Sequence, residues 1–254
     1  MNPIAYVHPD KYENYQLNPD VTTAKRVIQT LRDAGVDAHE NDQFDWIHDS
    51  FLILIRMFPE KCPPTTLISQ NARYDPHWHM RIGSILRSYR KEGYLIIGTG
   101  GAVHNLYRND WAQMVGYRDN FAMPSPPEDC MLEFRQAFED AVTKNSGPAL
   151  RRAVTRLMKH PEYRNAHGTD EHFIPATFVA GAAGDEEDVG SPGVFGAEDW
   201  ELVSRPFCRF IAWLRGHHAD YIAEEYGQQP VHVRVMAARE DGRCSMMGMV
   251  HGHR

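Results

Sequence analysis

Residues 94–106 read Tyr-Leu-Ile-Ile-Gly-Thr-Gly-Gly-Ala-Val-His-Asn-Leu. The apolar run from Tyr94 to Ile97 is rich in residues that favour strands, and it is too short for a helix. The glycines that follow allow the backbone to turn sharply and to approach a ligand closely. We therefore expect a buried strand that ends in a functional loop, with His104 just past its carboxyl end, where open α/β sheets bind ligands. An ordinary surface loop with an incidental histidine is the alternative.

Helix and strand signals alternate on both sides of this loop. A strand is predicted over residues 65–68. Helical spacing of apolar residues predicts helices from Asp20 to near Gly35 and over 76–89, 128–143, 148–160 and 173–183, the last of them capped by Thr169. The alternation predicts a single α/β domain over residues 1–254, with a mixed central sheet flanked by helices.

The last third of the chain gives a different set of signals. Residues 184–196 are acidic and rich in glycine, which is typical of a surface loop or a local insertion. Residues 199–226 are predicted to form an amphipathic helix. Residues 231–236 and 244–250 are expected to pair as a terminal hairpin.

Composition argues against two classes of partner. The net charge of −7 provides no positive field for nucleic acid. No apolar run approaches the ~20 residues of a membrane-spanning helix, and the N-terminus lacks the layout of a signal peptide. We therefore expect a cytoplasmic protein that binds neither nucleic acid nor a membrane. Its 14 histidines prompt a search for metal ligands and proton carriers.

Three motifs, in this order along the chain, carry the functional interpretation. They are Phe44–Glu60 with His48, Arg90–Leu106 with His104, and Thr169–Pro175 with His172. In this order they resemble the class III extradiol ring-cleavage dioxygenases, in particular the 4,5-DOPA dioxygenase-like proteins, which are related to the β subunit of protocatechuate 4,5-dioxygenase. The resemblance covers about residues 15–184, with a weaker echo at 245–247, and its middle motif is the most specific.

This resemblance implies an α/β fold like that of the catalytic chain of extradiol dioxygenases. It also implies a non-haem Fe(II) enzyme, or a zinc-bound form of one, that cleaves a catechol-type ring with incorporation of O₂. Such an iron needs a few imidazole or carboxylate ligands and keeps open positions for the diol and oxygen. A separate histidine must move protons. By position, His172 matches the third metal ligand of the family, His104 its acid/base histidine, and His48 a catalytic histidine near the substrate.

The chain also departs from the family pattern. The first two metal-ligating histidines of the family, in HGSP-like and SAHW-like loops, have no counterpart, so the resemblance implies an N-terminally incomplete domain. Asp49 replaces the glycine of the DHG motif, and Gly168 replaces a proline. His167 aligns with the first histidine of the HPTxEH motif, and a hydrogen-bonded loop residue is the alternative for that position.

Two other functions stay open. One is a catalytically impaired or inactive relative that acts as a structural or regulatory subunit. The other is a metal-independent hydrolase or isomerase that uses His104 with a carboxylate, although no GxSxG elbow supports nucleophilic catalysis. A homo-oligomer is compatible with each of these functions.

Overall fold

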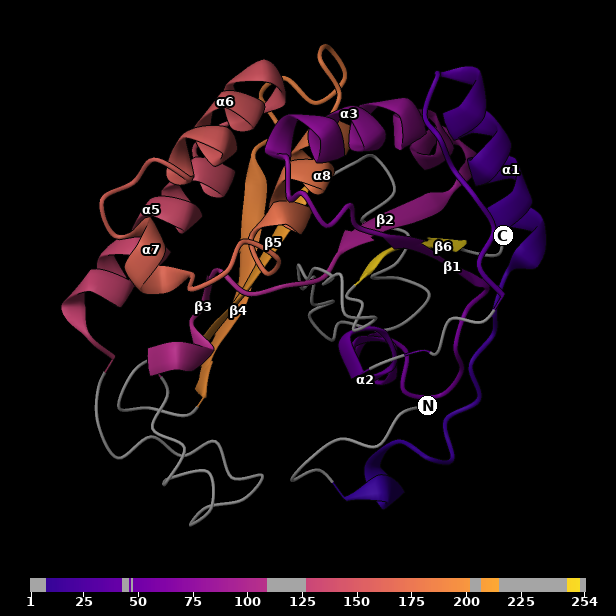
Figure 1. Cartoon of the computed structure of the whole chain (residues 1–254), viewed down its shortest axis with the longest axis horizontal. Coiled ribbons are helices and arrows are strands. Elements are labelled where there is room, and N and C mark those ends of the chain that lie inside the picture. The colour runs from indigo at the N-terminus through magenta and orange to yellow at the C-terminus, as the bar shows by residue number, and fades with distance from the viewer. Residues whose placement is uncertain are drawn as a thin grey trace.

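The computed structural model describes residues 8–42, 46, 48–108, 127–201, 207–214 and 246–251 (Figure 1). The helices in this part are α1 (Val21–Asp33), α2 (His48–Met57), α3 (Pro76–Leu86), α5 (Asp129–Thr143), α6 (Gly147–Leu157), α7 (Tyr163–Ala166) and α8 (Ile174–Ala182), with short 3-10 helices η1 (Pro9–Lys11), η2 (Arg87–Glu92) and η3 (Leu106–Arg108). The strands are β1 (Thr65–Ser69), β2 (Tyr94–Gly98), β3 (Val103–His104), β4 (Gly193–Glu201), β5 (Phe207–Leu214) and β6 (Met246–His251).

The described strands form two three-stranded sheets. In the first sheet β6 lies between β1 and β2, and in the second β5 lies between β3 and β4, with every neighbouring pair antiparallel. The mixture of helices and strands is as predicted, but the described strands do not join into a single mixed central sheet. The glycine loop after β2 carries the chain out of the first sheet and into β3 of the second, so two strands that follow each other in the sequence lie in different sheets.

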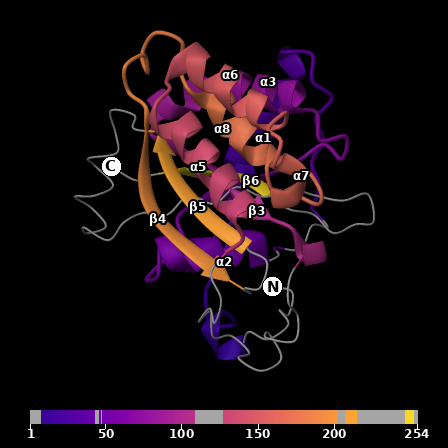
Figure 2. The same ribbon diagram turned by 90° about the vertical axis from the view of Figure 1, so that its left-hand side faces the viewer.

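The helices predicted in the first two thirds of the chain are found. α1 begins after Asp20, whose carboxylate accepts a hydrogen bond from the backbone N–H of Thr23 at 2.9 Å. This side-chain cap satisfies one of the free N–H groups at the helix start. Helix α3 ends at Leu86, and the rest of the segment predicted with it continues as η2. Figure 2 shows α5 beside β4 and β5, which it contacts.

The prediction of a helix over residues 199–226 is wrong where the structure describes it. Residues 199–201 belong to β4 and residues 207–214 to β5, and the two strands pair antiparallel. β5 is rich in aromatic residues that favour strands, and sheet pairing outweighs their approximate helical spacing. The predicted surface loop is also shorter, because β4 begins at Gly193.

Only the second strand of the predicted terminal hairpin is confirmed. β6 (Met246–His251) replaces the strand expected over 244–250, and it pairs with β1 and β2. The proposed partner at 231–236 lies outside the described residues. In the described ranges, each helix is too short or too polar to cross a membrane.

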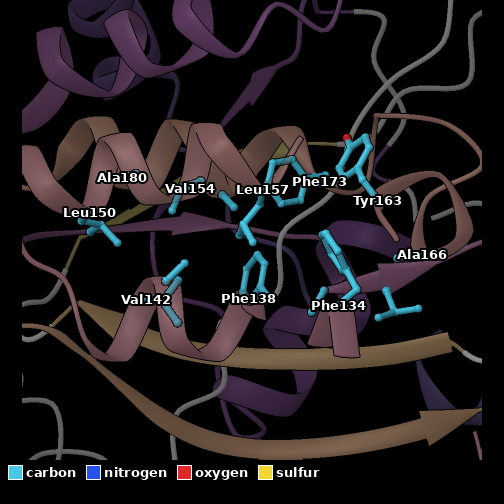
Figure 3. Packing of buried hydrophobic residues seen from close by; sticks show 14 of the residues in the cluster. Phe134, Phe138, Val142, Leu150, Val154, Leu157, Tyr163, Ala166, Phe173 and Ala180 are labelled. Atoms are coloured by element: carbon cyan, nitrogen blue, oxygen red, sulfur yellow. The ribbon is translucent and has the colours of Figure 1, made fainter. Parts of the chain in front are cut away.

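Helix α8 lies at the centre of the core. It is apolar around nearly its whole circumference, with eight of its residues buried, and a helix of this kind is stable only when it is covered on all sides. Phe173 and Ala180 contribute to one hydrophobic cluster with α5, α6 and Tyr163 (Figure 3). Phe178 contributes to a second cluster with α1, α3 and β2.

Arginine side chains cap the C-terminal end of α8. Arg87 donates to the carbonyl oxygen of Gly181 at 2.9 Å, Arg90 to that of Ala182 at 3.0 Å, and Arg151 to that of Ala183 at 3.0 Å. Cations at this end interact favourably with the helix dipole and satisfy its last carbonyl groups. The counter-charges come from the turn that follows: Asp185 pairs with Arg87 and Arg151, and Asp188 pairs with Arg90.

Glycines allow α3 and α8 to approach very closely. A Cβ atom on Gly83 would overlap the carbonyl oxygen of Phe178, and one on Gly181 would overlap the carbonyl oxygen of Met80. Backbone atoms cannot move aside as the end of a side chain can. The contact between the two helices therefore requires glycine at both positions.

We expect Gly83→Ala to lower the free energy of unfolding by on the order of 1–3 kcal/mol, because the added methyl group forces α3 away from α8. Urea unfolding followed by circular dichroism measures this change. The control is Thr22→Ala on the exposed face of α1, for which we expect a change within about 0.5 kcal/mol. Equal stability of the Gly83→Ala variant and the unmodified protein would contradict the close packing.

Candidate functional site

The structure brings His104 and His172 together. Their imidazole rings stack with centroids 3.3 Å apart and planes 11° apart. His104 ends β3 and is only 5% exposed, while His172 lies just before α8. Two residues from distant motifs of the sequence therefore meet where β3 reaches the start of the central helix.

Hydrogen bonds join the segments that carry these two histidines. The backbone N–H of Gly101 donates to the carbonyl oxygen of His172 at 3.3 Å. His104 and His167 form a parallel bridge. The ring atom Nε2 of His167 lies 2.8 Å from the carbonyl oxygen of Ala102. The glycine loop is thus held against residues 167–172 at several points.

His167 is a fully buried, hydrogen-bonded histidine. The rings of Phe134, Tyr163 and Phe173 surround it, with centroids 5.4, 5.3 and 5.5 Å away, and Figure 3 shows these three side chains in the core. Burial lowers the pKa of His167 to about 4, so its ring is neutral near pH 7. A carbonyl oxygen can only accept, so Nε2 carries the proton of the neutral ring.

Asn105 links His104 to α7. Its Nδ2 atom donates to the carbonyl oxygens of Asn165 at 2.8 Å and Arg164 at 3.4 Å, and its Oδ1 atom accepts from the backbone N–H of Tyr107 at 3.2 Å. The side chain is buried, with 5% exposed. Sequence reasoning gave Asn105 no role of its own, and its position next to His104 was the available signal.

The turn between α7 and α8 differs from its prediction. Thr169 does not cap a helix, because its hydroxyl group donates to Glu171 and the N-cap of α8 is Phe173. Pro175 explains the later start, since proline is tolerated only in the first turn of a helix. Asp170 organises this turn by accepting hydrogen bonds from the Tyr163 hydroxyl group at 3.0 Å and from Arg164 at 2.6 Å.

The predicted role of His48 stays a prediction. His48 is the first residue of α2, and its side chain lies outside the described part of the structure. The preceding motif residues 44 and 45 are outside it as well. Helix α2 contacts β6 of the first sheet.

The described residues do not by themselves fit a catalytic metal ion. Among them, no group of three or more His, Cys, Asp or Glu side chains is arranged to hold one. Mononuclear metal sites generally take three protein ligands. His172 is therefore a candidate ligand without a complete set of partners in the described ranges.

Known proteins of similar sequence include several dioxygenases. The chain is 24% identical over 172 residues to the 4,5-DOPA extradiol dioxygenase of Escherichia coli K12, an alignment that covers 66% of this chain and 58% of that protein. It is 32% identical over 167 residues to the 4,5-DOPA extradiol dioxygenase of Portulaca grandiflora, covering 64% of this chain and 56% of the relative. A dioxygenase of Hapsidospora irregularis is 29% identical over 188 residues, with 71% and 56% covered.

The chain thus spans little more than half the length of these relatives. No family model matches it. Its fold is similar to that of an uncharacterized protein from Escherichia coli K12 known from a crystal structure, with a TM-score of 0.57 and 23% identity over 73% of this chain and 70% of the other. This likeness supports a shared fold.

We expect His167 to make the fold sensitive to acid. Above the ordinary histidine pKa of 6.5 the ring is neutral in the folded and the unfolded chain, but below it only the unfolded chain binds the proton until the pH approaches about 4. Stability is therefore lost as the pH falls through this window. Between pH 7 and pH 5 the unmodified protein should lose about 2 kcal/mol more than the His167→Gln variant, as measured by urea unfolding. Equal losses in both proteins would show that His167 is not buried as described.

Proposed function

The chain is related to the class III extradiol dioxygenases, and we propose that it takes part in the extradiol cleavage of a catechol-type ring by O₂. The observation that supports this proposal is the stacking of His104 on His172. Proton transfer beside a diol requires a histidine held in a fixed orientation and shielded from bulk water. His104 has both properties in this structure.

In this proposal His104 is the acid/base residue. Its imidazole takes a proton from a hydroxyl group of the bound diol and returns a proton to the cleaved product. The stacked ring of His172 limits rotation of His104 and so keeps the proton-accepting atom in one direction. His48 is the second proposed catalytic residue, on the substrate side of the site.

Fe(II) is the proposed cofactor, with zinc as the metal of a purified or related form. His172 is the ligand that the described residues offer. Since they contain no cluster of three metal-binding side chains, the further ligands have to come from outside the described ranges or from another chain.

We expect oxygen uptake when the full chain is reconstituted anaerobically with ferrous iron and then mixed with a panel of catechols in air-saturated buffer. His104→Gln should lower kcat by roughly 10²–10⁴-fold, because it removes the group that transfers the proton. The control is His77→Gln, at an exposed position in α3, which should leave kcat unchanged. An iron-loaded protein that consumes no oxygen with any catechol would refute the proposed function.

The incomplete set of metal ligands in the described ranges favours a second candidate function. This is a catalytically impaired relative that acts as a structural or regulatory subunit. Elemental analysis of the purified chain separates the two candidates: clearly less than one iron or zinc per chain, with no gain on reconstitution, supports the non-catalytic role. One tightly held metal per chain supports the enzyme.

A further inference from the structure

We propose that Asn105 and His167 are positioning residues that hold His104 stacked on His172. This inference rests on the proposed function, because the stacked pair is the proposed proton-transfer site. The arrangement of the two rings can nevertheless be measured in a protein that has no activity. Neither residue needs to touch a substrate in this role.

His167 fixes the chain before His104. Its bond at 2.8 Å is made to the carbonyl oxygen of Ala102, two residues before His104. The imidazole itself is immobilised by the aromatic rings around it and has no exposed surface. A buried donor that is locked in this way holds its acceptor in one place, since breaking the bond leaves polar groups unsatisfied in the core.

Asn105 fixes the chain immediately after His104. Its amide group donates to the carbonyl oxygens of Asn165 and Arg164, at the end of α7. The backbone of β3 is therefore tied on both sides of His104 to the segment that leads into His172. The bond from Gly101 to the carbonyl oxygen of His172 closes the connection.

Gly168 makes room for this arrangement. A Cβ atom at this position would lie 2.7 Å from Oδ1 of Asn105 and 2.6 Å from the ring of Tyr107. A proline, which the resemblance leads one to expect here, would push both residues away. The departure from the family pattern at residue 168 is thus accounted for by the close approach of Asn105 to the turn before His172.

The test uses the full chain with isotope-labelled histidine and measures the nuclear Overhauser effect (NOE) between the ring protons of His104 and His172, assigned with His104→Gln and His172→Gln. Stacked rings at the observed distance give a strong NOE. We expect His167→Leu and Asn105→Ala to abolish it. We expect His167→Gln to retain it, because the glutamine amide can still donate to the Ala102 carbonyl oxygen and rescues the bond.

The matched control is His79→Leu. His79 is equally buried and is bonded to a backbone carbonyl oxygen, that of Asp75, at 2.6 Å. His79 is followed by Met80, whose backbone packs against Gly181 near the C-terminal end of α8. His172 lies at the opposite, N-terminal end of this helix. This variant should lower the melting temperature and leave the NOE intact, which separates a positioning role from general destabilisation.

Loss of the NOE in His79→Leu, or its persistence in both His167→Leu and Asn105→Ala, would overturn the inference. If His167→Leu does not fold, Asn105→Ala decides alone.

Where the protein turns over a catechol, the two variants should lower kcat on the order of tenfold to a hundredfold with KM little changed, as expected for a misplaced catalytic group. An intact NOE in an inactive unmodified protein would refute the proposed function and leave the positioning role standing.

Discussion

The burial of α8 is the constraint on which the rest of the structure depends. A helix without a polar face has to be covered completely, and α3 and β2 cover one side of it while α6 covers the other; α1 and α5 extend the two hydrophobic clusters around it. Close contact with α3 further requires glycine at two positions. The start of α8 is thereby fixed in space, and with it His172. The packing of the core therefore also holds the candidate site rigid.

The site lies where a loop from the first sheet reaches this central helix. His104 belongs to the short strand that follows the glycine loop. On one side of it Ala102 is bonded to His167, directly after α7, and on the other side Asn105 is bonded to α7 itself. Loops that are tied to a rigid framework are well suited to carry functional residues. Here both polar side chains that tie the loop are buried, and that of His167 lies among aromatic rings, so they add precision as well as stability.

Local signals in the sequence predicted much of the first two thirds of the chain. The Asp20 cap, the glycine after α1 and the apolar spacing in α3, α5 and α6 are properties of short segments, and they appear as expected. The sheets depend on pairing between distant segments, which local spacing does not report. β6, which lies near the C-terminus, pairs with both β1 and β2. β5 forms in a segment whose apolar spacing predicts a helix. The resemblance assigns both His104 and His172 to one catalytic site, and the structure brings their rings together. The bonds of Asn105 and His167 go to backbone carbonyl groups, which leave no mark in a sequence.

The arginine cap of α8 couples the unfolding of this helix to that of the turn that follows it. Three guanidinium groups converge on the last carbonyl groups of this helix, and two aspartates from the turn that follows, the exposed Asp185 and the buried Asp188, offset most of their charge. A protease that cuts this turn would release the counterions, and the remaining like charges would repel one another at the end of the most deeply buried helix. The surface turn and the interior of the protein should thus open as a single cooperative unit.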